Sequence, residues 1–155
     1  MDALPLFLNP SAIRCLLVGG GSVGERKLRV LVESGVRCRA VAVSFSAGFA
    51  EYAENHGVPC VERAFREDDI ADANLVIAAT NDHDTNSSSR SICDRRGVFV
   101  NCVDDGANSS ALFPSIVDRA PVTVAVSTGG ASPTLARRIR SEIEALLPAR
   151  LGAVA

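Results

Sequence analysis

The 155-residue sequence has no apolar run that approaches the roughly 20 residues a membrane-spanning helix needs. Its first ten residues, MDALPLFLNP, contain neither the basic segment nor the small-residue cleavage site of a secretory signal. A strong charge of one sign is also missing, because 16 basic and 18 acidic residues give a formal net charge of −2. We therefore expect a soluble, cytoplasmic protein without a nucleic-acid or membrane partner.

The cysteines follow no metal-binding or disulfide pattern. The cysteines are odd in number and include no C-x-x-C pair; they are Cys15, Cys38, Cys60, Cys93 and Cys102. We expect buried, reduced thiols and no bound metal. The sequence does contain 47% hydrophobic residues, which is enough for the core of one ordinary domain.

Strand-like and helix-like patterns alternate over the first 110 residues. Apolar or β-branched runs predict strands at 13–18, 36–44, 59–61, 75–80 and 98–103, and helical spacing predicts helices at 22–35, 47–56 and 84–96. This alternation predicts a Rossmann-like α/β domain over residues 1–110, with a doubly wound parallel sheet covered by helices on both faces.

The pattern changes after residue 105. Two β-rich runs, 111–117 and 122–127, are joined by the short sequence DRAP and predict an antiparallel hairpin. Ser132-Pro133 then starts a helix whose apolar spacing continues up to Pro148. A two-stranded appendage is barely stable alone in water, so we expect residues 111–155 to be the dimerisation region of a homodimer.

The sequence LLVGGGSVGERK, residues 16–27, joins the first predicted strand to the first predicted helix. Its spacing Gly19-x-Gly21-x-x-Gly24 is the dinucleotide-binding fingerprint. In that fingerprint the first glycine permits a tight turn, the second lets the backbone approach a pyrophosphate, and the third lets helix and strand pack closely. The helix N-terminus adds free N–H groups for the phosphates. The alternative is a glycine turn that serves packing alone.

The acidic residue that usually binds the cofactor ribose is missing. Residues 43–45, VSF, end the second predicted strand about 20 residues after the glycines, and no acid follows before Glu51. Ser44 offers a hydroxyl to the ribose, whereas Arg37 and Arg39 lie too early in the strand to bind a 2′-phosphate. The residues therefore favour NAD over NADP.

Two more loops belong at the carboxyl edge of the sheet, where parallel sheets bind their ligands. In TNDHD, residues 80–84, adjacent side chains rarely converge on one metal ion, so we interpret Asp82 or Asp84 as the cap of the next helix. Asp104 and Asp105 end the fifth predicted strand, where a carboxylate beside a cofactor could accept a proton. Their alternative role is that of solvated loop residues.

The segment VSTGGASP, residues 126–133, is similar to a second anion-binding turn ahead of a helix. It offers hydroxyls at Ser127, Thr128 and Ser132. The helix that follows carries arginines that either bind an anion or form a solvated basic face: Arg137, Arg138 and Arg140.

Six motifs occur in order along the chain: LPLF (4–7), VGGGSVGERK (18–27), AAT (78–80), NCVDD (101–105), FPSIVDR (113–119) and VAVSTGGASPTLAR (124–137). Through these motifs the sequence resembles the siroheme synthase family, and more narrowly its precorrin-2 dehydrogenase/sirohydrochlorin ferrochelatase domain. The resemblance covers essentially the whole chain. PSIVDR followed by VSTGGASP is far more specific than the glycine fingerprint.

The resemblance implies a Rossmann domain, a dimerisation region and NAD-dependent oxidation of the tetrapyrrole precorrin-2 to sirohydrochlorin. Many members also use Fe²⁺ as a substrate to make siroheme. The matching NAD contacts are Ser22, Val23, Val43 and Ser44, beside the three glycines and Thr80 of the AAT motif. Asp104 matches the carboxylate implicated in both reactions. The candidate contacts for substrate carboxylates are Ser127, Thr128 and Arg137.

The sequence departs from the family pattern at two places. Thr128 stands where related sequences can carry serine, and members usually continue into a small helical subdomain, or further into a methyltransferase domain. Here the sequence ends with LLPARLGAVA, so we expect that subdomain to be absent or truncated. Two alternatives stay open: a non-catalytic NAD-binding regulatory module, which needs neither Asp104 nor the 126–133 turn, and a truncated unit that binds NAD without turnover.

Overall fold

The computed structural model describes residues 2–103 and 105–148. These residues form two compact units. One unit comprises residues 5–111, and the other comprises residues 2–4 together with residues 112–148.

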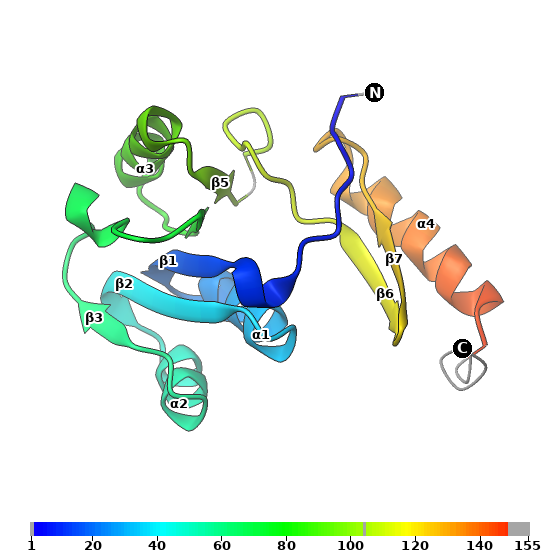
Figure 1. The fold of residues 1–155 in the computed structure, drawn as a ribbon, viewed down its shortest axis with the longest axis horizontal. Coiled ribbons are helices and arrows are strands. Elements are labelled where there is room, and N and C mark those ends of the chain that lie inside the picture. The colour runs from blue at the N-terminus through cyan, green and yellow to red at the C-terminus, as the bar shows by residue number, and fades with distance from the viewer. Residues whose placement is uncertain (1, 104, 149–155) are drawn as a thin grey trace. The chain divides into compact units, whose positions relative to one another are not determined.

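The unit of residues 5–111 contains a five-stranded parallel sheet with the strand order β3-β2-β1-β4-β5. The strands are β1 (Arg14–Gly20), β2 (Arg37–Phe45), β3 (Cys60–Glu62), β4 (Leu75–Ala78) and β5 (Phe99–Cys102). The α-helices are α1 (Ser22–Glu33), α2 (Ala47–Asn55) and α3 (His83–Arg96). Helices α1 and α2 lie on one face of the sheet and α3 on the other (Figure 1). The predicted doubly wound α/β fold is confirmed.

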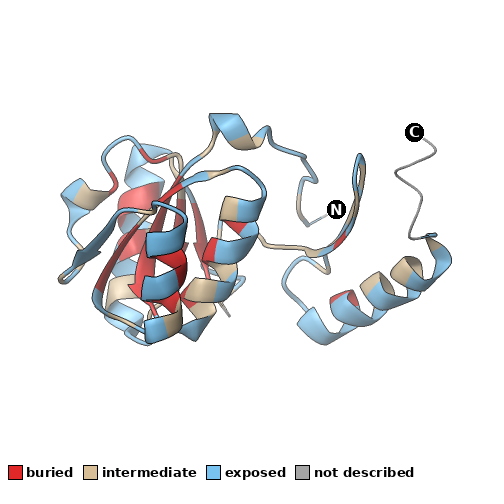
Figure 2. Ribbon diagram, turned by 90° about the horizontal axis from the view of Figure 1, so that it is seen from below, coloured by how far each residue is buried: buried red, intermediate tan, exposed pale blue. Residues whose placement is uncertain are grey.

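Burial on both sheet faces explains why the strands read as apolar runs. Six consecutive residues of β1, from Cys15 to Gly20, are buried (Figure 2). Leu16 and Val18 of β1 lie in a core cluster with Val76 of β4 and Ile92 of α3. Two 3₁₀ turns, Pro10–Ala12 and Glu67–Asp69, have no counterpart among the predicted elements.

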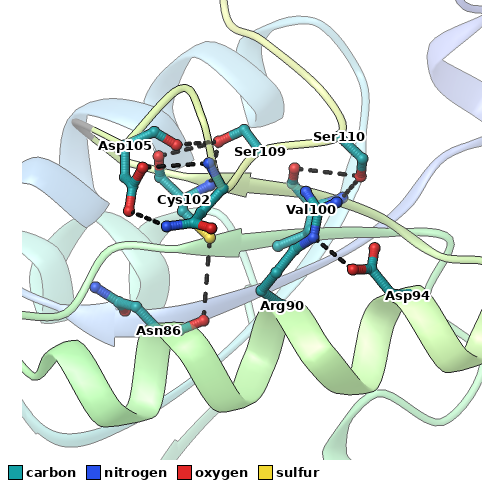
Figure 3. Close-up of polar contacts among 9 residues, drawn as sticks. Asn86, Arg90, Asp94, Val100, Cys102, Asp105, Ser109 and Ser110 are labelled. Atoms are coloured by element: carbon teal, nitrogen blue, oxygen red, sulfur yellow. Dashed lines mark hydrogen bonds and ion pairs between the residues drawn. The ribbon is translucent and has the colours of Figure 1, made fainter.

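The outer edge of β5 is covered by the chain that follows it. The backbone N–H of Val100 donates to Ser110 Oγ at 2.9 Å, and that of Cys102 donates to Ser109 Oγ at 2.8 Å (Figure 3). Ala111 donates its backbone N–H to the Val100 carbonyl at 3.0 Å. The predicted strand at 111–117 is therefore wrong at its start, because these contacts hold Ala111 against β5.

The second unit consists of an antiparallel hairpin and one helix. Strands β6 (Ser115–Arg119) and β7 (Val122–Val126) pair with Val117 opposite Val124, which confirms the predicted hairpin with a shorter turn. Helix α4 (Pro133–Leu146) begins after Ser132, whose Oγ accepts a hydrogen bond from the Leu135 N–H at 3.2 Å. Of the described residues in this unit, Val117 and Ala136 alone are buried.

Within residues 2–103 and 105–148, no helix has both the length and the apolar character required to cross a bilayer.

Candidate functional site

The glycine turn lies where β1 ends and α1 begins, at the centre of the sheet. Gly19 has φ +117°, and a Cβ added there would lie 2.4 Å from the Ala79 carbonyl oxygen, which follows β4. A Cβ on Gly20 would lie 2.4 Å from the Ser44 carbonyl oxygen at the end of β2. A Cβ on Gly24 would lie 2.7 Å from the Gly19 carbonyl oxygen. Close backbone packing therefore requires glycine at these three positions.

Gly21 differs from its neighbours, because nothing in its own surroundings requires a glycine. Its φ of −84° and ψ of −175° are extended values that any residue adopts, and a Cβ there would meet no atom within 4 Å. The empty space in front of Gly21 is what backbone approach to a bound phosphate needs.

Helix α1 begins without a side-chain cap. Gly21 is its N-cap residue and offers no side-chain acceptor, whereas Ser46, Asp82 and Ser132 cap the other three α-helices found among the described residues. The free N–H groups and the positive dipole end of α1 therefore remain available to an anion. Ser22, the first residue of α1, is exposed, and Val23 is half-buried.

The carboxyl end of β2 lies beside the glycine turn. Phe45 is the register partner of Gly20, and the Ser46 N–H donates to the Gly20 carbonyl at 2.8 Å. Val43 is 73% exposed and Ser44 is also exposed, so both side chains are accessible to a ligand at this edge. Arg39 lies earlier in β2, and its guanidinium donates to backbone carbonyls of the loop before β4.

Thr80 follows β4 and is tied to the start of α3. Its hydroxyl donates to Asn86 Oδ1 at 2.8 Å, and Asn86 Nδ2 donates back to the Thr80 carbonyl at 3.0 Å. Asp82 is the N-cap of α3 and accepts from the Asp84 N–H at 3.2 Å, as predicted for this segment. Hydrogen bonds from the Thr85 hydroxyl and from the Asp84 backbone hold the pKa of Asp82 below its ordinary value.

Asp105 is held by its own loop. Its carboxylate accepts from Asn108 Nδ2 at 2.7 Å and from the Asn108 backbone N–H at 3.2 Å, and these bonds hold the pKa of Asp105 below its ordinary value (Figure 3). Asp104, the predicted catalytic carboxylate, lies outside the described residues. Its neighbours Val103 and Asp105 both line a cavity of about 330 Å³.

This cavity lies at the carboxyl ends of β4 and β5, beside the first turn of α3. Its polar lining includes Thr80, His83, Asn86, Asp105 and Asn108. His83 belongs to the 80–84 loop that was expected at this edge, whereas Asn86 was not predicted to line the site. The signal for Asn86 is positional, because it stands three residues after His83 in the first turn of a helix that follows a strand end. Within residues 2–103 and 105–148, no group of three or more His, Cys, Asp or Glu side chains could hold a metal ion.

The predicted substrate contacts belong to the second unit. The Thr128 hydroxyl donates to the Ser132 carbonyl at 3.1 Å and accepts from the Ser132 N–H at 3.0 Å, so it closes the turn. Ser127 Oγ accepts from the Gly129 N–H at 3.1 Å, which leaves its own proton free to donate.

The arginines of α4 differ in how they are paired. Arg138 and Arg140 form ion pairs with glutamates one turn further along α4, at 3.0 and 2.9 Å. Arg137 is exposed, and its guanidinium donates to Thr134 Oγ1 at 3.3 Å. Arg137 is therefore the member of the group best able to bind an external carboxylate.

Comparison with known proteins agrees with this geometry. Residues 6–115, which contain the whole glycine turn and the five-stranded sheet, match the family model described as putative NAD(P)-binding. The chain belongs to this family. NAD(P) is thus the cofactor class, and the space in front of Gly21 and the uncapped start of α1 fit its pyrophosphate.

The relatives that this NAD(P)-binding chain matches are longer than the chain itself. Residues 119–146 match a second model, described as sirohaem biosynthesis protein central. All 155 residues align with a siroheme synthase from Enterobacter sp. (strain 638) at 44% identity and with one from Methylococcus capsulatus at 42%. The predicted resemblance to siroheme synthases is confirmed. The chain spans about a third of the length of these relatives, 34% and 33% respectively.

A solved structure has the same fold as this NAD(P)-binding chain. The protein is named SirC, precorrin-2 dehydrogenase, and superposes with a TM-score of 0.83 over 97% of this chain and 74% of its own. The two sequences are 22% identical, so the likeness establishes the fold.

Proposed function

We propose that this chain oxidises precorrin-2 to sirohydrochlorin with NAD as the electron acceptor. The proposal is supported by 44% identity to a protein named siroheme synthase, and by the fold of a protein named precorrin-2 dehydrogenase. The single structural observation that carries it is Gly21, a glycine that the fold itself does not need and that leaves open space at the start of α1.

Separate groups of residues bind the separate parts of the cofactor. The first N–H groups of α1, at Ser22 and Val23, bind the pyrophosphate, and Gly21 admits it. Exposed Val43 and Ser44 bind the adenosine ribose, and the absence of a basic residue at 43–45 favours NAD over NADP. Thr80, fixed by Asn86, completes the edge next to Gly19. Bound NAD would supply a hydride acceptor.

Asp104 is the proposed general base. Oxidation of precorrin-2 removes a proton together with a hydride, and a carboxylate at the end of β5 can accept that proton. Asp105 is the matched control, because both of its carboxylate oxygens already accept hydrogen bonds from Asn108. Asp104→Asn should lower the oxidation rate by about 10²–10⁴-fold. Asp105→Asn keeps an acceptor for the Asn108 N–H and should stay near the wild-type rate.

These two variants also decide the assignment. If the Asp105 variant loses activity and the Asp104 variant keeps it, the base is Asp105. If both remain active, the proton passes to water or to the substrate's own carboxylates, and the proposed role of Asp104 is wrong. NAD affinity should change little in either variant, because the glycine turn holds the cofactor.

The assay for the function uses the purified chain with precorrin-2 and NAD. We expect NADH and the sirohydrochlorin absorption spectrum to appear together, in equal amounts. NAD binding by calorimetry without NADH formation would instead identify a regulatory module or a unit that binds NAD without turnover. Titration with NADP in the same cell tests the cofactor preference.

Iron insertion is a second proposed activity, supported by the name siroheme synthase that the relatives carry. In this reaction Fe²⁺ is a substrate, and Asp104 would accept pyrrolic protons as the metal enters. The test adds Fe²⁺ to preformed sirohydrochlorin with and without protein, since the metal also inserts spontaneously. A rate equal to the protein-free rate would remove this activity from the proposal.

We also propose a homodimer formed through residues 111–147. On the hairpin, Ile116 of β6 and its register partner Ala125 of β7 are exposed, and Leu135 of α4 is 47% exposed. A second copy would bury these apolar groups. A cytoplasmic location is proposed as well, because all five cysteines lie in the described part of the chain as free thiols.

A further inference from the structure

A second cavity lies at the opposite end of the strands from the glycine turn. Its volume is about 420 Å³, and its lining includes the first residues of β1 and β2, among them Cys15 and Cys38. Arg14, Arg37 and Arg39 line the same cavity and make it electropositive, partly offset by Asp72. None of these residues belongs to the proposed NAD site.

Cys15 and Cys38 are direct partners in the parallel register of β1 and β2. Neighbouring strands lie about 4.8 Å apart. A disulfide joins Cα atoms that are about 4.4–6.8 Å apart. Register partners also project to the same face of a sheet. The backbone is therefore already placed for a bond between the two sulfurs.

The two thiols are not equivalent. The interaction between the Cys15 and Cys38 side chains raises the pKa of Cys15 and lowers the pKa of Cys38. Burial raises the pKa of Cys15 further. The Cys38 thiol in turn points to the Val36 carbonyl at 3.6 Å. Cys38 is thus the sulfur of the pair that forms a thiolate more easily.

We propose that Cys15 and Cys38 form a reversible, peroxide-oxidised dithiol, with Cys38 as the reacting sulfur and Cys15 as the resolving sulfur. The Cys38 thiolate attacks hydrogen peroxide; an S–O bond forms, the O–O bond breaks and hydroxide leaves. The Cys15 sulfur then attacks Cys38; the S–S bond forms, the S–O bond breaks, and water leaves with the Cys15 proton. Two thiols are oxidised by two electrons, and one peroxide is reduced to water.

The disulfide would enclose the residues between 15 and 38, which include the entire glycine turn and α1. Because the bond lies at the amino ends of the strands, it leaves the space in front of Gly21 open. The inference concerns a modification site and does not rest on the proposed dehydrogenase activity.

The other cysteines serve as internal comparisons. Burial raises the pKa of Cys93 to about 11 and also raises that of Cys102. Cys60 is exposed, although partial desolvation raises its pKa, and its register partner is Ala40 instead of a cysteine. We therefore expect Cys38 to react at least about tenfold faster than Cys93. The higher pKa of Cys93 leaves a smaller fraction of this residue as thiolate. The greater nucleophilicity of each Cys93 thiolate offsets about half of that disadvantage on a logarithmic scale.

The test treats the reduced, folded wild-type chain with hydrogen peroxide, alkylates the remaining thiols after denaturation and maps the peptides by mass spectrometry. We expect a Cys15–Cys38 cross-link, lighter than the two thiols by two hydrogen atoms and reversed by dithiothreitol. The Cys60→Ser variant should give the same cross-link. In Cys15→Ser, a sulfenic acid should persist on Cys38 and be captured by dimedone, and Cys38→Ser should give no capture at Cys15.

Because the wild-type mapping needs no substitution, the result does not depend on how the variants fold. Oxidation of Cys60 while Cys15 and Cys38 stay reduced would overturn the proposal. Dimedone capture on Cys15 with an inert Cys38 would reverse the two roles and equally contradict it.

Discussion

Replacing Gly21 by valine tests whether the glycine turn binds a cofactor or only packs. The structure places no atom within 4 Å of a Cβ at this position, and its extended φ and ψ suit valine. The isopropyl group would therefore point into the space that we assign to the pyrophosphate. We expect a folded protein that has lost most of its affinity for NAD.

The magnitudes follow from the same geometry. Valine is a poorer helix N-cap than glycine by about 1 kcal/mol. Loss of glycine restricts the unfolded chain, which stabilises the fold by about 0.4–1 kcal/mol. The unfolding free energy should thus change by less than about 1 kcal/mol. Losing two backbone hydrogen bonds to a charged phosphate, at about 1.5–3 kcal/mol each, weakens binding by about 3–6 kcal/mol, or about 10²–10⁴-fold in Kd.

Calorimetric titration with NAD and thermal unfolding measure the two effects separately. Gly24→Ala is the matched control, because its Cβ would lie 2.7 Å from the Gly19 carbonyl oxygen. That variant should lose about 1–3 kcal/mol of stability, with a Tm lower by about 4 °C or more. An unchanged NAD affinity in folded Gly21→Val would refute the reasoning and leave the turn a purely structural one.

Three further predictions concern the substrate, the pH dependence and the assembly. Arg137→Gln should raise the KM for precorrin-2 by about tenfold or more with little change in kcat. The control Arg138→Gln loses only an exposed ion pair, so it should change the KM by less than about twofold. Asp69 accepts two hydrogen bonds from Arg63, and these bonds hold the pKa of Asp69 below its ordinary value. They therefore stabilise the folded state above pH about 4, and this stabilisation is lost as the pH falls further. Asp69→Asn should therefore cost about 1–3 kcal/mol at pH 7 by denaturant unfolding, and the difference from wild type should shrink in acid. Light scattering at micromolar concentration should give twice the mass of one chain, and a monomer would count against the interface at 111–147.

Local chemistry was sufficient to predict most element boundaries. Asp82 or Asp84 was predicted to cap a helix, and Asp82 does so. Helix α3 ends at Arg96, as predicted, and Gly97 follows it with φ +67°. The glycine turn was recognised because its spacing and its strand-to-helix context occur together in one short segment. Such features depend on residues within a few positions of one another, and a sequence displays them directly.

Long-range contacts set the features that the sequence did not reveal. Residues 111–114 are apolar enough for a strand, yet Ala111 pairs with Val100 of β5, and no local pattern predicts that contact. Asn86 lines the cavity because β4 and β5 lie side by side, and no local pattern predicts that role. Cys15 and Cys38 are 23 positions apart in the chain, and their pairing depends on the register of β1 with β2.

The serines that close the outer edge of β5 also bear on aggregation. A bare edge strand offers a row of N–H and C=O groups on which a strand from another molecule can add. Here the N–H groups of Val100 and Cys102 are taken by hydroxyls of Ser110 and Ser109, which cannot continue a backbone ladder. At the other edge, β3 is only three residues long. Copies of this unit that collide at high concentration therefore find little exposed strand from which a cross-β stack could grow.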